Sequence, residues 1–365
     1  MSTPGPNPDP FAMRRAAQPY LPFLSVSPMG PGDGGNFGSA TPQTTTQGVQ
    51  EAIHALGPNG GCVEVAPGIN LGTVTVDRPG VRLRFGSSWK TTVVENLVID
   101  SIDGQIGQVD VVGGTFHQVN FTPRGDHNIT NVRWWGPHFL VNRGGGIKYN
   151  NGPGENYVQA IDFFGARFMD TNGGGQANFV GGNNGSAGHY KYWSPYYVAA
   201  NSPAPATWLG FPAPPANMGT VIAMIGGSFC CYNPSGLKLV DVPGGNGGDT
   251  FVRGIHWDHC YYEAHAKITG VSLGAVAPGL LHFYNVFDQC TYNMAPSGAW
   301  ATGDVANTRW KPRARSGRSG IVTVHGNLTG VPTYGDGNLG TNTEDYVAAV
   351  VDPHGFLRGS GPGTT

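Results

Sequence analysis

The sequence predicts an all-β protein in which short parallel strands stack into a single-stranded β-helix, and three observations favour this fold class. First, the chain between residues 220 and 294 repeats itself every 30 residues, as a solenoid does when its rungs bury their apolar faces only by stacking. Second, the repeated segments are short and rich in aromatic and β-branched residues. Third, Gly, Pro, Asn and Asp separate them. The repeat predicts three columns of like residues: Cys230, Cys260 and Cys290; Tyr232, Tyr262 and Tyr292; and Val221, Phe251 and Leu281.

The composition suits a turn-rich β protein and argues against two classes of partner. The 365 residues include 59 Gly and 29 Pro, yet 39% are hydrophobic and 11% aromatic, which is enough for a core. Only 12% are charged and the formal net charge is −2, so we expect no nucleic-acid partner. The sequence shows neither a signal-peptide pattern nor an apolar run of membrane-spanning length, so we expect no membrane insertion.

The five cysteines do not form the even framework of a disulfide-stabilised protein. They also lack the closely spaced pairs of a zinc site. We expect them to pack as small apolar side chains inside the coil. No motif in the sequence indicates a metal or another cofactor, and none is expected.

The two ends of the chain differ from the middle. Residues 1–40 are dominated by Pro, Gly, Ser and Asn and predict an N-terminal arm that contacts other proteins of an assembly. Residues 331–365 are Gly-rich and hold one apolar segment, Tyr346 to Val351. They predict a C-terminal cap or tail, because the last strand of a solenoid is an exposed edge that needs cover. The β-helix is therefore expected over residues 41–330.

Residues 41–57 predict a short helix at the start of the coil. Thr44 and Gln47 have the spacing of a capping box, and the glycines of residues 57–61 end the helix. Its predicted buried face has helical spacing and consists of Val49, Ala52, Ile53 and Leu56.

The segment GGCVEVAPGIN at residues 60–70 follows this helix and resembles the start of the pectate-lyase and phage-tailspike superfamily. In that superfamily a helix ending in paired glycines leads into a strand and caps the open end of the coil. Asn70 stands where the family usually has Tyr. The resemblance implies a right-handed parallel β-helix with residues 41–57 as its capping helix.

Further rungs are predicted from weaker repeats. The segment Val111 to His117 (VVGGTFH) matches Met224 to Cys230 (MIGGSFC), and two more strands are predicted at 129–135 and 158–164. Asn and Gly between them suit corners that need a positive φ.

Residues 172–217 break the period and predict a long loop insertion rich in aromatic residues. Three roles are open for it: stacking on sugar rings, packing against a neighbouring subunit, or folding back over its own solenoid. If it binds a glycan, the expected substrate-binding residues are Tyr190, Tyr192, Trp193, Tyr196, Tyr197 and Trp208.

The 30-residue register places Asp258 beside Asp288, and these are the candidate catalytic residues. Stacked rungs would bring the two carboxylates within about 5 Å, close enough to share a proton as the acid and base of glycosidic cleavage do. In an unbroken strand, Asp258 would point to the same face as Cys260, two residues later. If the cysteines point inward, Asp258 faces outward only where the coil turns a corner at Asp258–His259. Ordinary turn chemistry is the alternative explanation for both aspartates.

Taken together, these patterns predict a virion structural protein of the phage tail, fibre, tailspike or decoration type. It would be made in a host cytoplasm, assemble as a homo-oligomer, with a trimer favoured, and bind a cell-surface polysaccharide. The alternative is a polysaccharide hydrolase or lyase that uses Asp258 and Asp288, with an extracellular location. The residues favour the structural role and leave the enzymatic one open.

Overall fold

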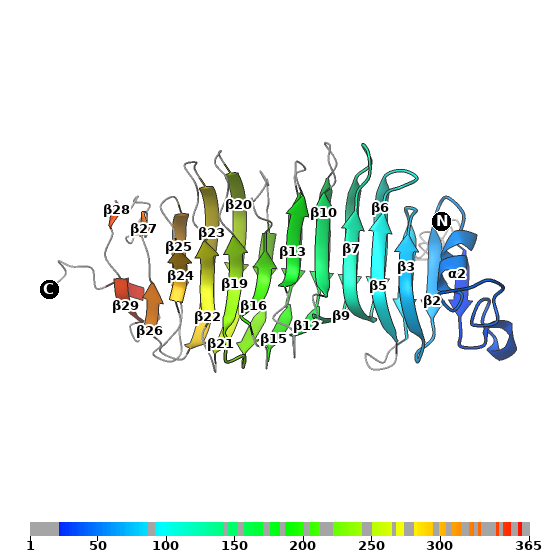
Figure 1. The fold of residues 1–365 in the computed structure, drawn as a ribbon, viewed down its shortest axis with the longest axis horizontal. Coiled ribbons are helices and arrows are strands. Elements are labelled where there is room, and N and C mark those ends of the chain that lie inside the picture. Colours follow the sequence, from blue (N-terminus) through cyan, green and yellow to red (C-terminus); the bar gives the residue numbers. More distant parts are fainter. Residues whose placement is uncertain are drawn as a thin grey trace, which may run out of the picture.

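The computed structural model describes residues 22–86, 92–141, 145–151, 157–170, 176–182, 187–200, 204–211, 222–242 and 250–264, and after these only the backbone of strands. These strands follow one another along the long axis in sequence order, with the helix α2 (Val49–Ala55) at the N-terminal end (Figure 1). Nearly all of the strand pairs are parallel, so the predicted all-β class with parallel strands is confirmed.

Each strand pairs with the equivalent strand one rung earlier and one rung later, along three faces. The first face consists of β1 (Phe23–Val26), β2 (Gly61–Val65), β4 (Val81–Phe85), β6 (Ile106–Val112), β8 (Ile129–Trp135), β11 (Val158–Phe164), β14 (Ala187–Trp193), β17 (Ile222–Ile225), β20 (Thr250–Asp258), β23 (Leu281–Met294) and β25 (Thr308–Ala314). The second face consists of β3 (Asn70–Val76), β5 (Val93–Asp100), β7 (Thr115–Thr122), β10 (Gly146–Asn151), β13 (Gln176–Gly182), β16 (Ala206–Gly210), β19 (Leu237–Val242), β22 (Ile268–Leu273), β24 (Ala299–Gly303) and β26 (Ile321–Val324).

A third, narrow face lies between the other two. It consists of β9 (His138–Leu140), β12 (Arg167–Asp170), β15 (Tyr196–Ala199), β18 (Ser228–Cys231) and β21 (Tyr261–Ala264). The long strand β7 pairs with both β9 and β10, so one strand in the early rungs divides into two in the later ones. The chain therefore coils through two and then three strands per rung.

A left-handed backbone residue turns the corner between the first and third faces in every one of these rungs. The corner residues are Gly113, Gly136, Gly165, Ser194, Gly226 and His259, with φ between 49° and 68°. The corner residues from Gly113 to Gly226 each donate their N–H to the last carbonyl of the next first-face strand, as Gly165 does to Trp193 at 2.8 Å. The predicted match of VVGGTFH with MIGGSFC is confirmed, since both glycine pairs occupy this corner.

The rungs are not all 30 residues long, which corrects the predicted columns. Cys230 lies beside Glu263 rather than Cys260, and Phe229 rather than Tyr232 lies beside Tyr262. The period of 30 holds only for the next rung, where Tyr262 pairs with Tyr292. In the apolar column, Leu281 pairs with Thr250 instead of Phe251, and Val221 lies outside the described residues. Unequal connections between strands shift the register from one rung to the next.

Large side chains stack inside the coil because parallel pairing sets each inward residue beside its equivalent. The inward column of the first face is fully buried and consists of Val63, Leu83, Val111, Trp134, Phe163, Tyr192, Met224 and Trp257. Phe163 stacks on Tyr192 with ring centroids 4.7 Å apart and planes within 3°. Cys231 and Cys260 are buried in this core, as expected of small apolar side chains. Cys230 is also buried, but it faces outward, against the expectation, because it lies between the inward Phe229 and Cys231.

Residues 172–217 are not a loop insertion, contrary to the sequence prediction. They contain β13, β14, β15 and β16, all of which pair in parallel with the rungs before and after. Connections of unequal length, most of them rich in Gly, Asn or Pro, separate these strands and hide their period in the sequence. The aromatic residues of this segment therefore belong to the coil itself.

The N-terminal end is closed by a helix that is shorter than predicted. Helix α2 begins at Val49, and the hydroxyl of Thr44 accepts a hydrogen bond from the Gly48 N–H at 2.7 Å. The same hydroxyl donates to Glu51 at 3.0 Å. The N-cap residue is Gly48, so the predicted capping box of Thr44 and Gln47 is wrong. The predicted buried face is confirmed, since Val49, Ala52, Ile53 and Leu56 are all buried.

Residues 22–40 of the predicted arm of residues 1–40 belong to the fold instead, because β1 already pairs with β2. The 3-10 helix η1 (Gly30–Asp33) follows, and Val26 bridges to Phe37. Residues 1–21 lie outside the described residues. At the other end the pairing becomes antiparallel, through β26, β29 (Tyr346–Val351) and β30 (Leu357–Gly359), with a separate pair β27 (Leu328–Thr329) and β28 (Thr341–Asn342).

The alternation of inward and outward residues can be tested with two neighbours in β11. Phe163→Ala removes a fully buried ring that stacks on both Trp134 and Tyr192, so the free energy of unfolding should fall by about 3–5 kcal/mol. Phe164→Ala is the matched control, because Phe164 is half-buried and points outward, and its cost should be clearly smaller. Denaturant unfolding of both variants gives the comparison, and equal or reversed costs would contradict this register.

Candidate functional site: the outer surface of the first face

Two columns of outward side chains run along the first face. One alternates in charge, and its members lie next to one another in register: Arg82, Asp110, Arg133, Asp162 and Lys191. We call this the charged column. The other lies two residues further along each strand and consists of Trp135, Phe164 and Trp193. We call this the aromatic ladder. Both follow from parallel pairing, which repeats an outward position on every rung.

The aromatic ladder is exposed to solvent although it is apolar. Trp135 is 42% exposed and Trp193 is 38% exposed. The ring of Trp135 stacks on Phe164 with centroids 4.2 Å apart and planes within 11°, and Phe164 stacks on Trp193 with centroids 6.1 Å apart. Aromatic stacking of this kind stabilises by about 0.5–1.5 kcal/mol per pair, but it leaves ring edges and the two end faces uncovered. Such a surface is typical of an interaction site.

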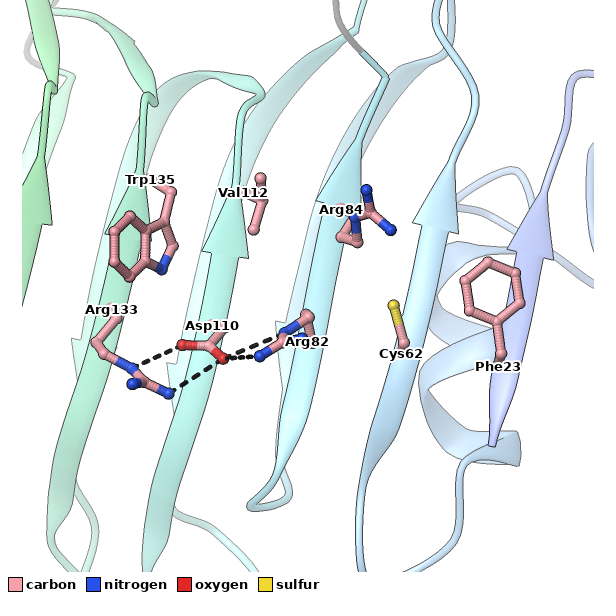
Figure 2. A pocket seen from close by; sticks show the side chains of 8 residues that line it. All are labelled: Phe23, Cys62, Arg82, Arg84, Asp110, Val112, Arg133 and Trp135. Atoms are coloured by element: carbon pink, nitrogen blue, oxygen red, sulfur yellow. Dashed lines mark hydrogen bonds and ion pairs between the residues drawn. The ribbon is translucent and has the colours of Figure 1, made fainter. Parts of the chain in front are cut away.

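Asp110 holds the N-terminal end of the charged column together. Its carboxylate is nearly buried and accepts hydrogen bonds from Arg82 at 2.8 and 3.2 Å. Arg133 donates one hydrogen bond to the same carboxylate at 3.2 Å, and its Nε lies 2.8 Å from the other carboxylate oxygen in an ion pair. The two guanidinium groups approach Asp110 from the flanking strands (Figure 2). Hydrogen bonds between charged partners are the stronger kind, so both arginine side chains are held in place.

A shallow groove of about 600 Å³ lies over these strands at the start of the coil. Its lining combines apolar and charged groups from β1 to β8 (Figure 2): Phe23, Cys62, Arg82, Arg84, Asp110, Val112, Arg133 and Trp135. The thiol of Cys62 is half-buried, and burial raises its pKa although Arg84 and Arg82 act in the opposite direction. This groove joins the end of the aromatic ladder to a cluster of guanidinium groups.

Four of the six predicted substrate-binding residues are in the wrong place for that role. Tyr190, Tyr192, Tyr197 and Trp208 are at most 1% exposed and pack inside the coil. The alternation along β14 turns Tyr190 and Tyr192 inward and Trp193 outward. Trp193 and Tyr196 (42% exposed) do reach the surface, on the first and third faces.

The buried tyrosines instead form part of a polar network in the core. The hydroxyl of Tyr192 contacts the hydroxyl of Tyr149 at 2.6 Å and donates to Asn178 at 2.8 Å, and Tyr190 donates to the carbonyl of Val158. Burial raises the pKa of Tyr149 and Tyr190 well above the usual value. These hydroxyls remain neutral and structural.

Tyr196 belongs to a second group of outward residues on the third face. Cys230 lies beside it, and the Sγ of Cys230 is 3.9 Å from a carboxylate oxygen of Glu263. Glu263 raises the pKa of the exposed Tyr232. The pKa of the Cys230 thiol is raised chiefly by burial and then by Glu263, so it is not an activated nucleophile.

Asp258 and Asp288 are partners in the register of β20 and β23, as predicted. The corner falls at His259, with φ 52°, which leaves Asp258 outward and Cys260 buried. The ring of His259 contacts the Asp258 carboxylate at 2.6 Å. The side chain of Asp288 lies outside the described residues. The catalytic role of this pair therefore stays a prediction.

Neither a metal site nor a membrane span is found in the part of the chain that the structure describes. No group of three or more metal-ligating side chains occurs among the described residues. Likewise, none of the helices there has the length and hydrophobicity needed to cross a bilayer.

Comparison with known proteins yields only distant structural likeness. No protein-family model and no curated protein matches the sequence. One solved structure, described as Geobacillus virus E2 - ORF18, is similar over 87% of this chain and 67% of that chain. The sequence identity is 12% and the TM-score is 0.32. A likeness of this size carries no conclusion about the function of this chain.

The sequence analysis missed Trp135, Phe164 and Arg84, although a signal for the ladder was present. Aromatic doublets end three first-face strands, at residues 134–135, 163–164 and 192–193, and they recur every 29 residues. The first member of each doublet lies inside and the second lies outside. A repeat of doublets, rather than of single residues, marks strands that are aromatic on both faces.

Proposed function

We propose that this chain is a structural component of a virus particle, of the phage tail, fibre or tailspike kind, folded as a right-handed parallel β-helix. We further propose that the outer surface of its first face binds a glycan on the host cell. The observation that carries the binding role is the aromatic ladder of Trp135, Phe164 and Trp193, exposed beside the charged column.

The chemistry of this surface suits a carbohydrate chain. A sugar ring has an apolar C–H face, which packs on aromatic rings, and a rim of hydroxyl groups, which need donors and acceptors. Arg133, Asp162 and Lys191 supply both in alternation along the ladder. Rungs about 4.8 Å apart present equivalent groups at a spacing comparable to the length of one sugar residue. A polymer lying along the coil axis meets the same chemistry repeatedly.

The particle role is supported by the sequence resemblance at residues 60–70 and by the low content of charge. The proposed partners are other virion proteins, bound through residues 1–40, and further copies of this chain in a trimer. Virion location follows from the same proposal.

Assembly can be tested on the purified full-length chain. Light scattering should give the mass of three chains, and gold-labelled antibodies against the protein should decorate purified virus particles at the tail. A monomer in solution that is also absent from particles would contradict the structural role.

Glycan binding can be tested by shortening the ladder at both ends. The double variant Trp135→Ala with Trp193→Ala removes the exposed indoles, and its affinity for a surface polysaccharide of the host should fall at least about tenfold, or roughly 1.4 kcal/mol. Tyr232→Ala is the control, because Tyr232 is equally exposed but lies away from the ladder. Titration calorimetry measures both. Unchanged affinity in the double variant would rule out the ladder as the binding surface.

One observation favours a second candidate function, a polysaccharide hydrolase or lyase. Asp258 and Asp288 are register partners, and paired strands lie about 4.8 Å apart, a separation close to that of retaining glycosidases. In this candidate, His259, in contact with Asp258, takes part in proton transfer.

The enzymatic alternative makes a distinct prediction. Asp258→Asn with Asp288→Asn should abolish the release of new reducing ends, or of unsaturated sugars, from a bound polysaccharide, while binding persists. Asp103→Asn is the control, since Asp103 is an exposed turn residue elsewhere. If the unaltered protein releases neither product, the chain binds glycan without cleaving it.

A further inference from the structure

We infer that the groove at the N-terminal end of the aromatic ladder is a subsite for one acidic sugar residue, with its ring on Trp135 and its carboxylate on Arg84. This inference rests on the proposed glycan binding and names the ligand class. It follows from a gap in the ladder and from the distribution of charge around that gap.

Trp135 keeps one ring face free. Phe164 covers the other face, but the next residue in the same column is Val112, which is too small to continue the stack. Val112 and Trp135 both line the groove, and Val112 lies between Trp135 and Arg84 (Figure 2). A sugar ring placed over Val112 therefore contacts the free face of the indole, as a further aromatic ring of the ladder would.

Arg84 is the guanidinium available to a ligand. Arg82 and Arg133 are both committed to Asp110, whereas Arg84 is exposed and makes no ion pair with any other described residue. Its neighbours in register are Val112 and Glu64. Three arginines against Asp110 and Glu64 leave one positive charge in excess, which suits a single carboxylate better than a doubly charged phosphate.

The spacing agrees with one sugar residue. Trp135, Val112 and Arg84 occupy three consecutive strands, so the Cα atoms of Trp135 and Arg84 lie about 10 Å apart. A pyranose ring stacked on the indole would extend its carboxylate across Val112 toward the guanidinium. Beyond Trp135 the polymer continues along the aromatic ladder. There its neutral sugar residues contact the edges of the aromatic rings and the side chains of the charged column.

The test compares acidic polysaccharides with forms that differ only in the carboxyl group. The probes are polysialic acid, hyaluronan and alginate, each beside its carboxyl-reduced product, titrated into the full-length protein by calorimetry. At least one acidic form should bind about tenfold or more tightly than its reduced product. Arg84→Gln should remove that difference. Arg167→Gln, an exposed arginine on the third face, should retain it.

A second variant fills the subsite without touching its charge. Val112→Phe should add a ring against the free face of Trp135 and exclude the sugar, so acidic binding should weaken although Arg84 remains. Alkylation of Cys62, which lines the groove, should be slowed by a bound acidic probe in the unaltered protein and not in Val112→Phe.

The outcomes separate the two proposals. Equal binding of acidic and reduced forms, or an acid preference that survives Arg84→Gln, overturns the acidic subsite and leaves glycan binding intact. Binding that is acid-dependent but leaves Cys62 alkylation unchanged places the carboxylate elsewhere and also overturns it. If neither these probes nor the host polysaccharide binds, the glycan proposal itself fails.

Discussion

Parallel pairing between successive rungs is the constraint on which the rest of the structure depends. It sets every side chain beside its equivalent one rung later, so a residue that packs well must be matched by a neighbour of similar shape. Inside the first face the large rings of Trp134, Phe163 and Tyr192 meet this requirement by stacking. The corner of each rung obeys the same rule, because one left-handed residue after another donates to the carbonyl below it.

The same constraint acts on the outside, where nothing requires similar residues to be neighbours for packing alone. An outward column in water usually holds polar side chains, as the charged column does. The aromatic ladder departs from that pattern. It ends at Trp135, because the next residue in the same column is Val112. Stacked rings protect one another's faces, so the uncovered surface is concentrated at the ladder's ends. The end beside Val112 is also the end at which arginines gather.

The sequence predicted the all-β class, the capping helix face and several strands to the residue, because each of these depends on local alternation and turn residues. Strands 129–135 and 158–164 match β8 and β11. It failed for residues 172–217, where Gly- and Pro-rich connections hid the strands and made Tyr190 and Trp208 look like loop residues. It also failed in register between Cys230 and Cys260, since the length of a connection is not visible in any pattern within the strands. The groove was not predictable at all, because its lining comes from five strands whose alignment depends on every preceding connection.

The coil also fixes how far apart two outward features lie. Trp135 in β8 and Asp258 in β20 are separated by four rung steps, or about 19 Å. Insertion or loss of one complete rung would change that distance by about 4.8 Å and leave the residues at both ends untouched. Duplication or deletion of one rung therefore changes the distance between two binding contacts by a fixed amount and leaves both contacts unchanged. Such a scaffold can be adapted in this way to polymers of different repeat length.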